Sequence, residues 1–217
     1  MEKKGIIFDV DGLLVDTEKL HIMAWEEVFK DKKINLSERD YEKGIGIDDR
    51  EFLEMMKKEG KIPSFYSIGD LCKEKKEKLL RLVEKVEINV FEGVKEVLKY
   101  LSGKVQMAVA TNSEREYVIK ILEKTGIKRF FKFIISRNDV KNPKPAPEIY
   151  LLAAEKMGLA PEKCIVFEDS ETGIEAAKRA GMFCIGVVTT QSPDKLKKAD
   201  VVIEKLSLEK IKKFLPI

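Results

Sequence analysis

Six short apolar segments, each typical of a β-strand, recur along the 217-residue chain and limit its fold most strongly. They cover residues 5–8, 105–110, 133–135, 164–167, 183–188 and 201–203. Most are unbroken rather than alternating with polar residues, which is typical of strands covered on both faces in a parallel sheet. Amphipathic helical patterns lie between them, as at 94–101 and 118–125. This alternation predicts an α/β fold with a Rossmann-like parallel sheet.

One long interval breaks the alternation. Residues 17–86 contain helical patterns and glycine-containing loops but no convincing strand pattern. We therefore expect an α-helical domain inserted after the first strand. The predicted α/β core comprises residues 1–16 and 87–217.

The overall charge and the cysteines exclude several classes of protein. The chain has 41 basic and 38 acidic residues, a net charge of +3, which predicts neither a nucleic-acid nor a membrane-surface partner. No apolar stretch approaches the ~20 residues of a membrane-spanning helix. The three cysteines are scattered and lack metal-ligand spacing, as expected of reduced thiols in the cytoplasm. We expect a cytoplasmic monomer that binds a small molecule.

Polar residues follow four of the predicted strands directly or after one loop. They are Asp9, Asp11, Thr111, Asn112, Ser113, Lys144, Glu168 and Asp169. In an open parallel sheet, ligands bind at the carboxyl ends of the strands. These side chains are therefore predicted to meet at one edge of the sheet, although Asp9 and Asp169 lie far apart in the sequence.

This set of residue types suits phosphoryl chemistry. Clustered carboxylates need a divalent cation, and oxygen ligands without Cys or His favour Mg²⁺. A lysine and a hydroxyl beside the cation can neutralise a transferring phosphoryl group. One carboxylate can attack phosphorus, and the second, two residues further on, can move protons.

Four segments resemble, in order, the four motifs of the haloacid dehalogenase-like hydrolase superfamily. "DVDGLLVDT" is similar to the first motif, "VATNS" to the second, "KPAPEIY" to the third and "VFEDSETGIEAA" to the fourth. The helical insert lies between the first and second motifs, where the helical-cap members of the superfamily carry their cap domain. The most similar group is that of the β-phosphoglucomutase-like sugar-phosphate enzymes.

The resemblance implies a role for each matching residue. Asp9 would be the nucleophile, and Asp11 the general acid and base. Thr111 would hold the phosphoryl oxygens, and Lys144 would link the phosphate to Asp9. The implied phosphate-binding residues of the core are Thr111, Asn112, Ser113 and Lys144. The implied Mg²⁺ ligands are Asp9, Asp11 (also through its main-chain carbonyl), Glu168 and Asp169.

The segment "DTEKLHIMAW" resembles the start of the cap in both the mutases and the sugar phosphatases of this group. Asp16 and Thr17 are expected to cap the following helix and to form the hinge. His21 and Trp25 share one helix face, and both are candidates for substrate binding; packing within the cap is the alternative for Trp25. Arg50 is a candidate cation for the substrate, as are Lys75 and Lys76.

The expected activity is Mg²⁺-dependent hydrolysis of a small phosphate ester, such as a sugar phosphate, through an aspartyl-phosphate. A β-phosphoglucomutase-type mutase is the first alternative. Against it, the mutase-like cap pattern "GxxRxxSL" reads "GIDDREFL" here, and Glu114 follows Ser113. A non-catalytic phosphometabolite-binding relic is the second alternative, disfavoured because Asp9 and Asp11 are both present.

Overall fold

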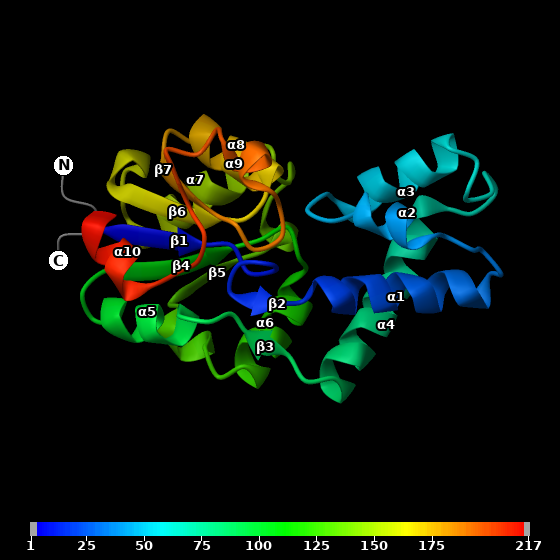
Figure 1. Cartoon of the computed structure of the whole chain (residues 1–217), viewed down its shortest axis with the longest axis horizontal. Coiled ribbons are helices and arrows are strands. Elements are labelled where there is room, and N and C mark those ends of the chain that lie inside the picture. The colour runs from blue at the N-terminus through cyan, green and yellow to red at the C-terminus, as the bar shows by residue number, and fades with distance from the viewer. Residues whose placement is uncertain (1–3, 215–217) are drawn as a thin grey trace. The chain divides into compact units, whose positions relative to one another are not determined.

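The computed structural model describes residues 4–214. Within these residues, six strands form one parallel sheet in the order β5-β4-β1-β6-β7-β8 (Figure 1). The strands are β1 Gly5–Phe8, β4 Gln106–Ala110, β5 Phe133–Ile135, β6 Cys164–Glu168, β7 Phe183–Val187 and β8 Val201–Ile203. All six predicted strands are present, with ends within one residue of those expected, and the α/β fold is confirmed.

Helices cover both faces of this sheet. Figure 1 shows α7, α8 and α9 on one face and α5 and α6 on the other. The bounds of these helices are α5 Val94–Leu101, α6 Arg115–Lys124, α7 Glu148–Met157, α8 Glu171–Arg179 and α9 Pro193–Leu196. A further helix, α10 Leu208–Phe214, follows β8. Short 3-10 turns occur at Lys128–Phe130, Arg137–Asp139 and Pro161–Lys163.

The sheet register explains why the strands are apolar throughout. Ile7 pairs with Ala108 on one side and with Val166 on the other. All three belong to one buried cluster with Ala153 of α7 and Ile174 of α8. Ile6 and Phe8 are also fully buried although they point to the opposite face. A strand buried on both faces has no polar alternation, as the sequence indicates.

The chain divides into two compact units. One comprises residues 4–16 and 88–214 of the described chain, and the other comprises residues 17–87. The first unit contains the six-stranded sheet, and we call the second the helical unit. Its helices are α1 Glu18–Asp31, α2 Glu38–Glu42, α3 Asp49–Lys58 and α4 Ile68–Lys85.

A two-stranded antiparallel ribbon lies where the chain leaves and re-enters the first unit. It pairs β2 Val15–Asp16 with β3 Asn89–Val90. The sequence analysis did not predict this ribbon, because two-residue strands carry no periodic pattern. Asp16 lies in β2 rather than at a helix cap. Thr17 is the N-cap residue of α1, but its side chain makes no capping hydrogen bond.

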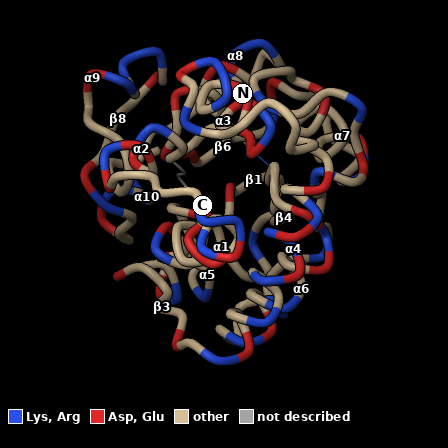
Figure 2. Tube along the Cα trace, turned by 90° about the vertical axis from the view of Figure 1, so that its right-hand side faces the viewer, with Lys and Arg blue, Asp and Glu red and all other residues tan. Residues whose placement is uncertain are grey.

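The helical unit has its own apolar core. Trp25 stacks on Phe29 with ring centroids 5.2 Å apart, and Phe52 packs beside them. Val28, Leu53 and other apolar residues complete this cluster. Basic and acidic residues are interspersed along the traces of both units (Figure 2). Within the described part of the chain, no helix is long and apolar enough to cross a membrane.

Candidate functional site

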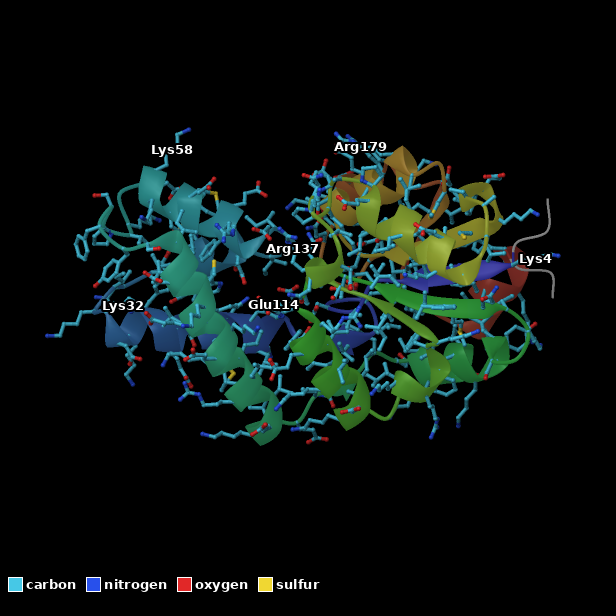
Figure 3. The ribbon with its side chains drawn as sticks, turned by 180° about the vertical axis from the view of Figure 1, so that it is seen from behind. Lys4, Lys32, Lys58, Glu114, Arg137 and Arg179 are labelled. Carbon is cyan, nitrogen blue, oxygen red and sulfur yellow. The ribbon has the colours of Figure 1, made fainter. Side chains whose placement is uncertain are left out.

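The sheet brings the predicted polar residues to one edge. Phe8, the last residue of β1, pairs with Val109 and with Phe167. Asp9 therefore follows β1 at the level where β4 and β6 also end, and its backbone N–H donates to the Phe167 carbonyl at 3.1 Å. Figure 3 shows Glu114 at this carboxyl end of the sheet, whereas Lys4 lies at the opposite end.

A buried lysine joins three of these strand ends. The Lys144 ammonium donates to Asp9 Oδ1 at 2.5 Å, to Glu168 Oε1 at 2.6 Å and to the Ala110 carbonyl at 2.9 Å. Asn112 holds the lysine backbone from both sides: its Oδ1 accepts from Lys144 N–H at 3.0 Å and its Nδ2 donates to the Lys144 carbonyl at 3.3 Å. The Asn112 side chain therefore fixes the loop that carries Lys144.

The electrostatics of this cluster favour an added positive charge. The pKa of Asp9 is raised to about 8, chiefly by burial; Lys144 opposes this rise, and the Glu168 and Asp11 carboxylates add to it. Burial disfavours the charged form of Lys144, but Asp9 and Glu168 outweigh it and raise the lysine pKa above its ordinary value. Two buried carboxylates thus share one ammonium, and a divalent cation near Asp9 would favour its ionised form.

Glu168 is enclosed, and both of its carboxylate oxygens are occupied. Oε1 accepts from Lys144 and from the Tyr150 hydroxyl at 2.5 Å, while Oε2 accepts from Asp169 N–H at 3.1 Å and from Ser170 Oγ at 2.9 Å. Its exposed fraction is 0%. Burial, with the nearby charge of Glu168, raises the Tyr150 pKa well above its ordinary value, so the hydroxyl stays a donor. Glu168 therefore lies behind Lys144, with its carboxylate oxygens accepting from groups of the protein.

Gly173, in the first turn of α8, makes room for this carboxylate. A Cβ atom added to Gly173 would lie 1.9 Å from Glu168 Oε1. The sequence analysis missed both Gly173 and Tyr150 as site residues. The available signal was a glycine inside a helical pattern. Such a glycine costs helix stability, so its presence points to close packing at that position.

Asp11 and Ser113 meet each other. Ser113 Oγ donates to Asp11 Oδ2 at 2.6 Å, and the Tyr117 hydroxyl donates to Asp11 Oδ1 at 2.8 Å. Thr111 is buried, and its Oγ1 accepts from Ser113 N–H at 3.1 Å. The β4–α6 turn thus contacts the acid of the β1 loop, and Tyr117 is a further residue that the sequence analysis missed.

Asp169 completes the edge beside the first motif. Its Oδ2 accepts from Thr190 Oγ1, and a Cβ on Gly12 would lie 2.3 Å from the same oxygen. The loop after Asp11 therefore runs against Asp169. Gly12 has a φ of 77°, which a residue with a side chain rarely adopts.

The oxygen donors at this edge suit a hard divalent cation. Asp9, Asp169 and the main-chain carbonyl of Asp11 are oxygen ligands of the kind that Mg²⁺ prefers. Within residues 4–214, no three His, Cys, Asp or Glu side chains form a metal-holding group. The raised pKa of Asp9 supplies an electrostatic reason for a cation beside it.

The candidate residues of the helical unit form a separate network. Lys75 is 3% exposed, donates to both Asp49 oxygens at 2.8 Å, and lies 2.9 Å from His21 Nδ1. Trp25 is 5% exposed and donates to Asp49 Oδ1 at 3.3 Å. Trp25 thus packs within the apolar core of the helical unit, as in the second of its two expected roles. Arg50 lies in the first turn of α3 and is exposed.

Comparisons with known proteins agree on one family. The sequence profile of the haloacid dehalogenase-like hydrolases matches residues 6–187. The chain is 33% identical to a phosphorylated carbohydrates phosphatase of Thermotoga maritima, with 82% of each chain covered. It is 32% identical to the fructose-1-phosphate phosphatase YqaB of Escherichia coli, covering 84% of this chain and 95% of that one. A β-phosphoglucomutase structure from Clostridium difficile superposes with a TM-score of 0.85 at 29% identity, covering 99% of this chain and 97% of that one.

Proposed function

Because this chain belongs to the haloacid dehalogenase-like hydrolase family, we propose that it is a Mg²⁺-dependent phosphatase of small phosphorylated metabolites, with sugar phosphates as its substrate class. The observation that carries this proposal is the buried contact of Asp9 with Lys144, 2.5 Å long, at the carboxyl edge of the sheet. It joins a carboxylate nucleophile to a cation that can neutralise a phosphoryl oxygen. Relatives named as carbohydrate phosphatases support the substrate class.

The reaction would proceed in two displacements. In the first, an Asp9 oxygen bonds to phosphorus, the bond from phosphorus to the leaving oxygen breaks, and Asp11 gives that oxygen its proton. In the second, Asp11 takes a proton from a water, whose oxygen bonds to phosphorus as the Asp9–phosphorus bond breaks. Free phosphate is released and Asp9 is regenerated. Lys144, which donates to Asp9 at 2.5 Å, would place its positive charge beside the phosphoryl oxygens, and Thr111 would bind them.

Asp9, Asp169 and the Asp11 carbonyl would hold the Mg²⁺ ion. When bound, the ion supplies positive charge that offsets the charge developing on the phosphoryl group. Glu168 would act on the site through Lys144, because its own oxygens are already occupied.

The helical unit would serve as the cap that selects the substrate. His21, held by Lys75 at 2.9 Å, is a candidate for assisting phosphate-linked proton transfer, and Arg50 is a candidate cation for the non-reacting end of the substrate. The proposed enzyme acts as a cytoplasmic monomer and needs no nucleic acid or membrane.

A phosphate-release screen tests the proposal. Wild-type protein with Mg²⁺ is assayed against sugar phosphates, phosphoglycolate, nucleotides and pyrophosphate, beside Asp9→Asn. We expect release from one or more sugar phosphates by the wild type and none by the variant. Absence of release from the whole panel, or full activity of Asp9→Asn, would refute the proposal. Tight ligand binding without release would favour a non-catalytic relic.

A β-phosphoglucomutase activity is the second candidate, favoured by the likeness to the β-phosphoglucomutase structure. A mutase must bind a second phosphate, and the acidic Glu114 directly after Ser113 disfavours one at the β4–α6 turn. A coupled assay that converts β-glucose 1-phosphate to glucose 6-phosphate, primed with the bisphosphate, separates the two. Turnover faster than hydrolysis would establish the mutase.

A further inference from the structure

The carboxylate of Asp11 is held at both oxygens by hydroxyl groups of the β4–α6 segment. Ser113 Oγ donates to Oδ2 at 2.6 Å and the Tyr117 hydroxyl donates to Oδ1 at 2.8 Å. The two donors lie four residues apart, one in the turn before α6 and the other in its first turn. They reach Asp11 from the neighbouring strand rather than from its own loop.

Both donors are firmly placed. Tyr117 is 2% exposed, so its ring is fixed in the core and only its hydroxyl meets the acid. Ser113 is fixed through its backbone: its N–H donates to Thr111 Oγ1 at 3.1 Å, and its carbonyl accepts from Arg137 N–H at 3.0 Å. Rigid donors on both oxygens restrict the rotamers of the Asp11 side chain.

We propose that Tyr117 is a positioning residue which, together with Ser113, holds Asp11 in place for proton transfer in the phosphatase reaction. The inference rests on the proposed function, in which Asp11 protonates the leaving oxygen. It also assigns the Ser113 hydroxyl to Asp11, rather than to the phosphate that the sequence analysis expected it to bind.

The proposal has a kinetic signature because it concerns proton delivery and not phosphate binding. A sugar alkoxide leaves only when it is protonated, whereas p-nitrophenolate leaves without help. Loss of the Tyr117 hydroxyl should therefore slow sugar phosphate cleavage more than p-nitrophenyl phosphate cleavage. A general loss of fold would slow both equally.

The experiment compares wild type, Tyr117→Phe and the distant control Tyr100→Phe, each with Mg²⁺. For Tyr117→Phe we expect kcat/KM to fall about tenfold on the best sugar phosphate and less than about twofold on p-nitrophenyl phosphate, because misplacing the acid forfeits part of the roughly 10²–10⁴-fold that acid–base catalysis supplies. The KM for the sugar phosphate should change little. Equal losses on both substrates, or no loss on either, would overturn the proposal.

A double-mutant comparison and a crystal structure complete the test. In an Asp11→Asn background, Tyr117→Phe should cause no additional selective loss, because the group it positions is gone. An undiminished selective loss there would overturn the proposal. Inactive wild type on every phosphate would refute the proposed function instead. Even in that case, crystal structures of the wild type and of Tyr117→Phe test the positioning role. The Asp11 carboxylate should adopt a different position in Tyr117→Phe, and an unchanged position would contradict the positioning role.

Discussion

Lys144 lies between Asp9 and Glu168, with its ammonium 2.5 Å from the first carboxylate and 2.6 Å from the second. Such a buried charge cluster stabilises only when every member is paired. Glu168 gains four further donors from Tyr150, Asp169 and Ser170. The pKa of Asp9 is raised to about 8, chiefly by burial and to a lesser degree by the neighbouring carboxylates. The arrangement fixes Glu168 from several sides, which agrees with the proposal that Asp9 is the reactive carboxylate.

Replacing the lysine should affect both activity and stability. In Lys144→Met the two carboxylates lose their shared cation, which costs about 3–5 kcal/mol when a buried pair is broken. Phosphate release should fall by about 10²–10³-fold, as when one charge-stabilising group is removed from a site. Phosphate assays and urea unfolding at pH 7 measure the two effects.

A surface lysine provides the matched control. Lys178 pairs with Asp200 at 2.6 Å but is 38% exposed. Lys178→Met should change the free energy of unfolding by no more than about 1 kcal/mol and leave phosphate release unchanged. Equal destabilisation by the two substitutions would contradict the buried-pair interpretation.

The sequence was sufficient to predict the sheet and the strand ends that carry the site. Asp9 and Lys144 could be predicted to meet because unbroken apolar runs identify parallel strands, whose carboxyl ends share one edge. The two-residue strands β2 and β3 could not be predicted, since their pairing depends on tertiary position alone.

The partners of the acidic residues were also beyond the sequence. Tyr117 and Tyr150 lie on the buried faces of helices. The sequence pattern of such a face is the same whether the tyrosine hydroxyl contacts solvent, the apolar core or a carboxylate. Trp25 and His21 share one helix face, yet Trp25 is buried in the helical unit while His21 reaches Lys75. The residues on the facing helices decide which of two neighbouring side chains packs in the core and which makes a polar contact.

Gly173 provides a steric test of the Glu168 position. In Gly173→Ala the new Cβ would lie 1.9 Å from Glu168 Oε1, so the carboxylate must move away from Lys144. Overpacking of this kind destabilises by about 1–3 kcal/mol, and we expect phosphate release to fall as well. Thermal unfolding and phosphate assays report both.

Gly69 is the control for that substitution, because it also lies in the first turn of a helix. A Cβ there would meet only Ser67 Oγ, at 3.7 Å. Gly69→Ala should therefore stabilise the protein by about 0.5–1 kcal/mol through helix propensity. If Gly173→Ala stabilised the protein as Gly69→Ala does, the inferred close packing of Glu168 against Gly173 would be wrong.

Removal of the metal should abolish turnover. Chelation by EDTA should stop phosphate release, added Mg²⁺ should restore it to saturation, and Ca²⁺ should inhibit because its coordination is looser. Since the pKa of Asp9 is about 8 without metal, bound Mg²⁺ must displace a proton at lower pH. The apparent Mg²⁺ affinity should therefore rise with pH up to about 8. Full turnover in EDTA would contradict the proposed metal dependence.

Asp40 should give the helical unit a pH-dependent contribution to stability. The carboxylate accepts from Lys61, from Ser37 Oγ at 2.7 Å and from Ser37 N–H at 2.9 Å, and these contacts lower its pKa well below the ordinary value. A lowered folded-state pKa stabilises above the unfolded pKa of about 3.9 and loses that contribution as the pH falls towards the folded value. Unfolding of wild type and Asp40→Asn from pH 7 to pH 2 should therefore show a difference that shrinks only below about pH 4. A difference independent of pH would show that the carboxylate charge contributes nothing.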